Sequence, residues 1–376
     1  MNRRLANLDL LRGLAALLVC ASHLREFLMV DYGQIKSPTI IDRIFYFTTG
    51  LGHQAVMVFF VLSGYLVGGS VLTAYQSGRW SWVNYSLRRM SRLWMVLLPA
   101  LVLTLAFDSL GRHWSPAGYD GKFEAVCNSV PTLAAPADLR ATTFLGNAFF
   151  LQTIEVPRLG TNGPLWSLAN EFWYYALFPL LCGVWFLRLW RGRFLFALVV
   201  ALLIWWLPAA IIWGGGIWLF GVLAFWLGRQ ERVRKFCSHP AWILFAGALS
   251  FGSLAASKTT SVFGTDWCIG GAFALWVIGL AACEHRFNWL KHFSAGLSEM
   301  SYSLYLVHFP LLAFIFFCFF DGKKFSPDTP SYLWFVSLLA LCVAYGGAIW
   351  WCFERNTDRL RKRIEIAFRL KKDAPH

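Results

Sequence analysis

The chain has 376 residues, of which 57% are hydrophobic and only 14% are charged. A soluble globular domain carries about a quarter charged residues, so this composition excludes an ordinary soluble domain and indicates a protein that crosses a membrane several times. The formal net charge of +14 does not indicate nucleic-acid binding, because the basic residues lie in short segments between apolar runs, as membrane topology requires.

Ten apolar runs have roughly the length that a membrane-spanning helix needs. They cover residues 8–28, 51–74, 93–110, 163–187, 194–213, 215–228, 241–256, 266–283, 301–320 and 332–352. Gly214, Gly215 and Gly216 predict a tight turn between the fifth and sixth runs. We therefore expect an all-α polytopic membrane protein with about ten transmembrane helices.

The first run, LDLLRGLAALLVCASHL at residues 8–24, carries Arg12 and His23. No clean small-residue cleavage site follows it, and Arg12 interrupts its apolar core, so we expect an uncleaved first span. A charged side chain at the centre of a spanning helix costs about 2.5–3.5 kcal/mol. Eleven residues make about three helical turns, so Arg12 and His23 share one face, which we expect to line an internal pathway.

The distribution of Lys and Arg predicts the orientation. With the N-terminus inside, the cytosolic segments hold 23 of these residues and the outer segments 10, counting Arg25 at the end of the first span. This asymmetry predicts that both termini are cytosolic. We expect residues 1–354 to form one integral membrane domain and residues 355–376 to form a basic cytosolic tail on the anionic inner leaflet.

The remaining segments suggest no metal chemistry. Within the long outer loop, TTFLGNAFFLQTI is apolar but too short to span, so we expect it to dip partway into the membrane. The nine cysteines are scattered, mostly inside apolar runs, and form no C-x-x-C pair. This spacing predicts neither a disulfide framework nor a zinc site.

Four stretches, in this order along the chain, resemble motifs of the acyltransferase 3 family, the membrane O-acyltransferases that decorate bacterial surface and secreted glycans. The spacing of Arg12 and His23 resembles the first-helix motif, and VFFVLSGYLVGG at 58–69 resembles the second-helix signature. The cytosolic sequence SLRRMSR at 86–92 supplies an arginine pair separated by two residues, Arg89 and Arg92.

The other two stretches complete the resemblance, which extends from Asp9 to Glu354. NGPLWSLANEFWYYALFP at 162–179 is similar to the family's tryptophan-serine-leucine helix with its acidic end, here Glu171. SYSLYLVHFPLL at 301–312 is similar to the penultimate helix and contains His308.

The resemblance implies an O-acyltransferase of the bacterial inner membrane. Its donor is expected to be an acyl-CoA, most simply acetyl-CoA, entering from the cytosol. Its acceptor is expected to be a hydroxyl of a glycan or lipid-linked sugar near the outer half. Many members carry a C-terminal SGNH-type hydrolase domain. We expect none here, so that the helices and outer loops bind the acceptor.

The residues in the first span suit this chemistry. An unperturbed histidine pKa near 6.5 makes His23 a usable base at neutral pH, and His23 could instead accept the acyl group itself. Arg12 stays protonated, so it would hold the donor or stabilise negative charge near the thioester carbonyl. An ion pair between Arg12 and Asp9, one turn away, is the structural alternative and is compatible with that role.

The remaining candidate residues are assigned to binding either the acyl donor or the acyl acceptor. Arg89 and Arg92 could bind the phosphates of coenzyme A, although positive-inside topology alone explains a basic loop, and only the resemblance favours binding. Glu171 falls near mid-membrane and needs a partner, for which Arg12, His23 or His308 could serve. His308, beside a bend expected at Pro310, is assigned to the wall of the substrate cavity. His53 could meet the acceptor or simply lie at the interface.

Two other functions stay open. A transporter or flippase of a glycan or lipid-linked intermediate would also suit intramembrane charges and broken helices, but we find no paired halves in the sequence. A membrane acyltransferase with a lipid or peptide acceptor is equally compatible with these motifs.

Overall fold

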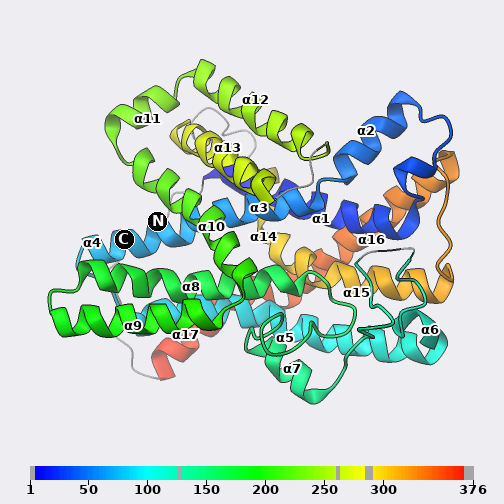
Figure 1. Ribbon diagram of the computed structural model, residues 1–376, viewed down its shortest axis with the longest axis horizontal. Coiled ribbons are helices and arrows are strands. Elements are labelled where there is room, and N and C mark those ends of the chain that lie inside the picture. Colours follow the sequence, from blue (N-terminus) through cyan, green and yellow to red (C-terminus); the bar gives the residue numbers. More distant parts are fainter. Residues whose placement is uncertain (1–4, 126, 128, 260–262, 284–290, 368–376) are drawn as a thin grey trace. The chain divides into compact units, whose positions relative to one another are not determined.

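The computed structural model describes residues 5–125, 127, 129–259, 263–283 and 291–367. In this part of the chain the protein is all-helical, with only two isolated β-bridges and no strand (Figure 1). The prediction of an all-α protein is therefore confirmed. Residues 1–4 of the first predicted segment and residues 368–376 of the predicted tail lie outside the described residues.

The helices follow one another along the chain, and the longest connections are those between α6 and α7 and between α7 and α8. They are α1 (Ala6–Leu28), α2 (Ile40–Thr49), α3 (Gly52–Ser63), α4 (Gly69–Gln76), α5 (Trp82–Trp114), α6 (Pro116–Tyr119), α7 (Ala141–Ala148), α8 (Leu165–Phe186), α9 (Trp190–Trp206), α10 (Ala209–Gly228), α11 (Glu231–Cys237), α12 (Pro240–Ala256), α13 (Phe263–Ala282), α14 (Lys291–Glu299), α15 (Ser301–Phe319), α16 (Thr329–Cys352) and α17 (Thr357–Ala367). A π-helical turn, η2 (Gly64–Gly68), joins α3 to α4, and short 3-10 turns lie at η1 (Tyr32–Gln34) and η4 (Glu354–Asn356).

Several of these helices can cross a membrane. Among the described residues, seven helical segments are long and apolar enough to span, and an eighth is added if α11 and α12, bent by 76°, count as one. Helix α9 has 17 residues, or about 25 Å, which is less than the roughly 30 Å of a hydrocarbon core. Helix α8 is longer but carries Asn170, Glu171 and several Trp and Tyr residues. The chain is therefore multi-pass, with fewer clear spans than the ten predicted.

The tight turn predicted at Gly214–Gly216 is wrong. These glycines lie inside α10, which starts directly after Pro208. Proline has a fixed φ and no N–H to donate, so it suits the start of a helix. The glycines serve packing instead, because a Cβ at Gly216 would lie 2.3 Å from the ring of Trp267, and one at Gly214 would collide with the hydroxyl of Tyr174.

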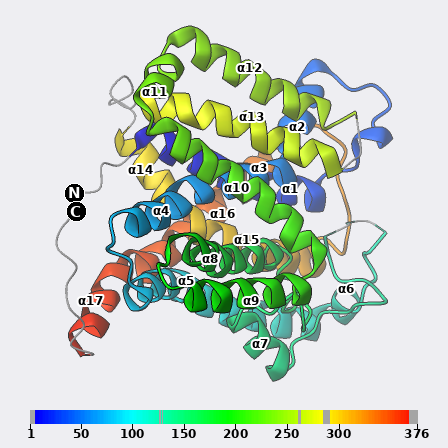
Figure 2. The ribbon, with the colours of Figure 1, turned by 60° about the vertical axis from the view of Figure 1, so that its left-hand side comes forward.

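The chain divides into two compact units. Unit 1 contains Met1–Arg12, His53–Arg89 and Ala169–Leu297, and unit 2 contains Gly13–Gly52, Met90–Leu168 and Ser298–His376. In unit 1, α12 packs beside α13, α13 beside α10, and α10 against η2 (Figure 2). In unit 2, α15 packs beside α16.

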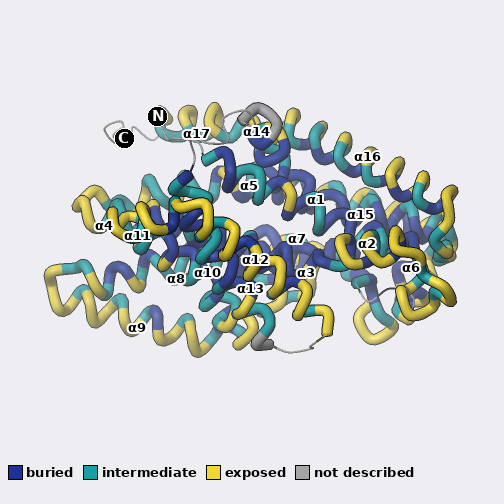
Figure 3. Tube along the Cα trace, turned by 90° about the horizontal axis from the view of Figure 1, so that it is seen from above, coloured by how far each residue is buried: buried dark blue, intermediate teal, exposed yellow. Residues whose placement is uncertain are grey.

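Some helices are buried in the core, whereas others expose large apolar side chains at the surface. Helix α15 is buried along most of its length (Figure 3). By contrast, α9 and α12 expose large apolar side chains such as Trp205 and Leu244. Exposed apolar surface of this kind is unusual on soluble proteins and is expected on helices that face lipid.

In two helices, a proline leaves one backbone carbonyl without its usual hydrogen-bond donor. In each case a side chain donates to that carbonyl instead. Pro310 cannot bond the carbonyl of Leu306, which instead accepts from Asn162 Nδ2 at 3.0 Å. Pro179 likewise frees the carbonyl of Tyr175, which accepts from the Tyr85 hydroxyl at 2.8 Å. These bonds matter because apolar surroundings offer no water to replace the lost donor. Helix α15 consequently continues through Pro310 as one element.

We predict that Asn162→Ala lowers the stability of the protein by about 1–3 kcal/mol, the cost of a buried polar group left without a partner. Asn356→Ala is the matched control, because the Asn356 side chain also donates to a backbone carbonyl, but in an exposed hydrogen bond. The measurement is the apparent melting temperature of both variants in detergent. Equal melting temperatures would contradict the role assigned to Asn162.

Candidate active site

Two intramembrane histidines are hydrogen-bonded to each other in unit 2. His23 lies on α1 and His308 on α15, and the His23 Nδ1 and His308 Nε2 atoms are 2.9 Å apart. The other ring nitrogen of His308 lies 2.9 Å from the Leu304 carbonyl, one turn earlier on α15. His308 is fully buried, whereas His23 keeps part of its surface accessible. The sequence analysis named both residues but did not predict that they bond.

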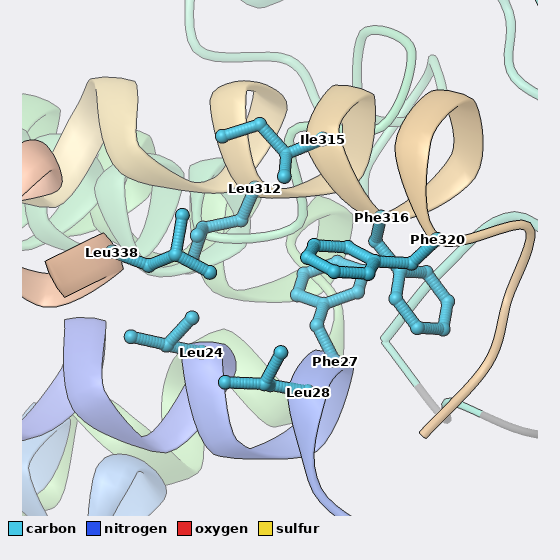
Figure 4. Close-up of a pocket in the computed structure, with 8 residues that line it drawn as sticks. All are labelled: Leu24, Phe27, Leu28, Leu312, Ile315, Phe316, Phe320 and Leu338. Carbon is cyan, nitrogen blue, oxygen red and sulfur yellow. The ribbon is translucent and has the colours of Figure 1, made fainter. Parts of the chain in front are cut away.

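One side of this pair is bounded by aromatic and aliphatic side chains. Phe309 meets the His23 ring edge-on, with ring centroids 4.9 Å apart, and Phe27 packs on Phe309. Beyond them α1, α15 and α16 enclose an apolar pocket (Figure 4). It is lined by Leu24, Phe27, Leu28, Leu312, Ile315, Phe316, Phe320 and Leu338. An apolar surround of this kind strengthens electrostatic interactions with His23.

Polar groups continue along α1 after His23. One turn later, the Ser129 hydroxyl donates to the Glu26 carboxylate, with the hydroxyl oxygen 2.9 and 3.2 Å from the two carboxylate oxygens. Arg158 donates to the Gly163 carbonyl at 3.4 Å, and burial lowers the pKa of this arginine. A Cβ placed on Gly163 would lie within 3.7 Å of Arg158, of the Ser129 carbonyl and of Phe309, the ring that touches His23. These groups therefore converge near the histidine pair.

A second polar cluster surrounds Glu171 on α8, within unit 1. Glu171 accepts from the hydroxyl of Ser63 at 2.8 Å and from the hydroxyl of Tyr175, one turn along α8. Trp218 on α10 in turn donates to Ser63 at 3.1 Å. Both hydroxyls donate to one carboxylate oxygen, Oε1. Charged partners were expected for Glu171 from the sequence, and neither hydroxyl was predicted.

Ser63 lies at an unusual place in the backbone. It directly precedes the π-helical turn η2, a rare feature that occurs often at functional sites. The next residue, Gly64, allows α10 to come close, because a Cβ there would collide with the carbonyl of Trp218. Gly64 thus permits close helix packing, and Ser63 beside it bonds Glu171.

The two arginines of the predicted donor site engage different groups. The Arg89 guanidinium lies 5.9 Å from the ring centroids of Tyr85 and Tyr175, and so adjoins the Glu171 cluster. Arg92 lies 3.8 Å from Glu354, a carboxylate that also accepts two hydrogen bonds from Ser303. Arg92 thus has a structural partner that the sequence analysis did not name, although 47% of its side chain is exposed.

The remaining candidates have local partners. Arg12 pairs with Asp9 at 3.5 Å, as the structural alternative predicted, and lies on the same continuous helix as His23. His53 lies 2.9 Å from Asp266, with 54% of its side chain exposed. Its contact with an acceptor stays a prediction. Among the described residues, no group of three His, Cys, Asp or Glu side chains is arranged to hold a metal ion.

Comparison with known proteins identifies the family. The model of the acyltransferase 3 family, described as an acyltransferase domain, matches residues 5–353. The chain belongs to the acyltransferase 3 family. Two Staphylococcus aureus proteins named Putative O-acetyltransferase, from strains COL and N315, are each 23% identical over 333 residues, covering 76% of this chain and 50% of the relative. The chain thus spans about half the length of these curated relatives.

Other comparisons add little. An uncharacterized protein of Haemophilus influenzae is 30% identical over 128 residues, which is 33% of this chain and 46% of that protein. No solved structure matches the chain.

We predict that Glu171→Gln lowers acyl transfer more than Glu155→Gln. Both hydroxyls donate to the same carboxylate oxygen, Oε1, and a neutral amide oxygen accepts weaker hydrogen bonds than a charged carboxylate does. A hydrogen bond to a charged group is worth about 1.5–3 kcal/mol, so a loss of about tenfold or more is expected. Glu155, in a loop, is the control. The measurement is transfer by membranes, normalised to protein level, and equal rates would remove Glu171 from the active site.

Proposed function

We propose that this chain is a membrane O-acyltransferase that moves an acyl group, most simply acetyl, from acyl-CoA to a hydroxyl of a cell-surface or secreted glycan. The observation that carries the proposal is the hydrogen-bonded pair of His23 and His308 in a member of an acyltransferase family. The name of the staphylococcal relatives supports an acetyl group and an oxygen acceptor.

His23 is the proposed base. It removes the proton from the acceptor hydroxyl, and the resulting oxygen attacks the thioester carbonyl. The carbon–sulfur bond then breaks, and His23 returns the proton to the sulfur of coenzyme A. If the acyl group passes first to His23, the same imidazole acts as the nucleophile.

Arg12 and Glu171 are the other proposed catalytic residues. Arg12 supplies fixed positive charge that holds the donor, since about 16 Å of α1 separates it from His23. Its contact with Asp9 orients the guanidinium. Glu171, held by two hydroxyls, supplies a carboxylate of fixed orientation for polar groups of the substrates.

Arg89 and Arg92 are proposed to bind the phosphates of the donor. Guanidinium groups suit phosphate because they donate two parallel hydrogen bonds. Among the described residues, Arg89 faces aromatic rings rather than a carboxylate, whereas Arg92 lies beside Glu354. Arg89 is therefore the stronger candidate of the two.

The acceptor is proposed to be a sugar, presented at the end of α1 that carries His23. Glu26, Ser129 and Arg158 offer the charged and hydroxyl groups that bind polyols. His53 is proposed to contact the acceptor as well, since most of its side chain is exposed. His308 is fully buried, which favours an action through His23 over the direct substrate contact that the sequence suggested.

We further propose that the protein crosses the bacterial inner membrane ten times with both termini in the cytosol. Residues 1–354 would form the membrane domain, and residues 355–376 a basic tail. The excess of Lys and Arg in alternate connections supports this orientation. Helix α17 supports the tail, because it carries four basic residues on an exposed helix: Arg359, Arg361, Lys362 and Arg363.

The alternative function is a transporter or flippase without acyl chemistry, which the intramembrane charges would also suit. A transporter does not consume acyl-CoA, so turnover of the donor discriminates between the two. An acyltransferase with a lipid or peptide acceptor differs only in the product.

We predict that His23→Ala abolishes glycan acylation, because loss of a general base typically costs about 10²–10⁴-fold in rate. The variant removes a polar group from the membrane, so insertion should be retained. The measurement is mass spectrometry of surface glycans from a deletion strain complemented with wild type, His23→Ala or His113→Ala. His113 is an exposed histidine at the end of α5 and serves as the control. Wild-type acylation with His23→Ala would show that the proposed mechanism is wrong.

A further inference from the structure

We propose that His308 is a positioning residue that fixes the tautomer of His23, so that His23 carries its proton on Nδ1 and presents a bare Nε2 to the substrates. The inference deepens the proposed function of His23 and rests on it. It concerns which nitrogen does the chemistry and what holds it in that state.

The Leu304 carbonyl determines which nitrogen of His308 is protonated. A carbonyl oxygen can only accept, so the His308 Nδ1 atom, 2.9 Å away, must carry a proton. His308 is fully buried, and none of the described residues places a carboxylate against it. A second proton would therefore create a buried charge without a counter-charge, which is costly. The neutral ring has one protonated nitrogen, and His308 Nε2 is left as an acceptor.

That acceptor faces His23. Its Nε2 atom lies 2.9 Å from His23 Nδ1, and one of two facing nitrogens must donate. Because His308 Nε2 is bare, the proton sits on His23 Nδ1. The neutral His23 ring then has no proton on Nε2, which is the state that a general base or an acyl acceptor requires.

The ring geometry supports a good hydrogen bond. The two rings are inclined by only 14°, and their centroids are 5.2 Å apart. That separation is close to the 2.9 Å between the bonded nitrogens plus the two ring radii. The rings therefore lie end to end and nearly coplanar, so the N–H of one points along the lone pair of the other.

His23 Nε2 has no hydrogen-bond partner among the described residues. The ring is hydrogen-bonded to His308 through Nδ1 and meets Phe309 edge to face, and His23 keeps part of its surface accessible. When Nε2 takes a proton, the His23 Nδ1–H bond to His308 remains and stabilises the imidazolium. A neutral partner does this without burying a carboxylate in the membrane.

The fold holds His308 at the required place. Gly346 on α16 lets that helix approach α15 at Leu304, because a Cβ there would lie 2.9 Å from the Leu304 Cα. Two residues along α15, Asn162 donates to the Leu306 carbonyl that Pro310 leaves free. The residue whose carbonyl fixes His308 is thus itself fixed by tertiary contacts.

The direct test is nitrogen-15 solid-state NMR of the full-length protein, labelled at histidine, in lipid bilayers. The His23 signals are assigned by their loss in His23→Ala. Protonated and bare ring nitrogens resonate in well-separated regions. We expect a protonated Nδ1 and a bare Nε2 for His23. A proton on His23 Nε2 in the wild-type protein would overturn the proposal.

Kinetics of two His308 variants give a second test. The amide oxygen of His308→Gln can reach the position of the Nε2 acceptor, whereas His308→Leu keeps apolar bulk and loses the acceptor. We expect His308→Leu to lower kcat by about tenfold or more, with KM for acyl-CoA little changed, and His308→Gln to restore much of kcat. If His308 only packs against its neighbours, His308→Leu should have a higher kcat than His308→Gln, because a buried amide fits an apolar site worse than leucine does. Higher kcat for His308→Leu than for His308→Gln would contradict the proposal.

The two tests separate this inference from the proposed function. If the NMR gives the expected tautomer but the purified protein transfers no acyl group, the role of His308 stands and the acyltransferase assignment fails. If transfer occurs and His23 carries its proton on Nε2, the acyltransferase assignment stands and the role of His308 fails. The wild-type NMR decides the question even where a His308 variant does not fold.

Discussion

The hydrogen bond between His23 and His308 is the constraint around which unit 2 is arranged. Two imidazoles in apolar surroundings must satisfy each other's nitrogens, since an unpaired buried polar group costs several kcal/mol in hydrocarbon. The 2.9 Å contact therefore ties α1 to α15, and the Leu304 carbonyl completes the chain of bonds. His23 Nε2 is the one ring nitrogen of the pair that these hydrogen bonds do not use. A requirement of stability thus leaves a single reactive position.

The same rule explains how the helices tolerate residues that normally break them. Pro310 and Pro179 each free a carbonyl, and Asn162 and Tyr85 each donate to it. Both donors lie close to residues with proposed chemical roles. Tyr85 bonds the backbone of Tyr175, whose hydroxyl meets Glu171. Specific side chains therefore hold the helices where a proline interrupts their hydrogen bonds. The same contacts position the residues with proposed chemical roles.

Much of the architecture was readable from the sequence because it depends on local patterns. Apolar runs predicted most helices, and the spacing of Arg12 and His23 predicted a polar face on a helix that the structure shows to be continuous. Glycine gave the main error, because Gly214–Gly216 read as a turn from their conformational freedom. In fact they are helical, with the rings of Tyr174 and Trp267 packed against them. That role depends on residues distant in sequence, and no local signal reports it.

The partners of the candidate site residues were the least predictable feature. The sequence indicated that Glu171 and His23 need polar neighbours, because intramembrane charges and histidines are rarely isolated. It could not say that a serine before a π-helical turn meets Glu171, or that the neighbour of His23 is His308. A hydroxyl or a second histidine in an apolar run is only a weak signal by itself. Its meaning comes from the helix that packs against it.

The most direct test of the account uses the purified full-length protein in proteoliposomes, supplied with radiolabelled acetyl-CoA and a sugar acceptor. The account predicts that label passes from coenzyme A to a hydroxyl of the acceptor with wild-type protein and not with His23→Ala, at equal amounts of folded protein. Folded wild-type protein that never consumes acyl-CoA would contradict it and would favour a transporter.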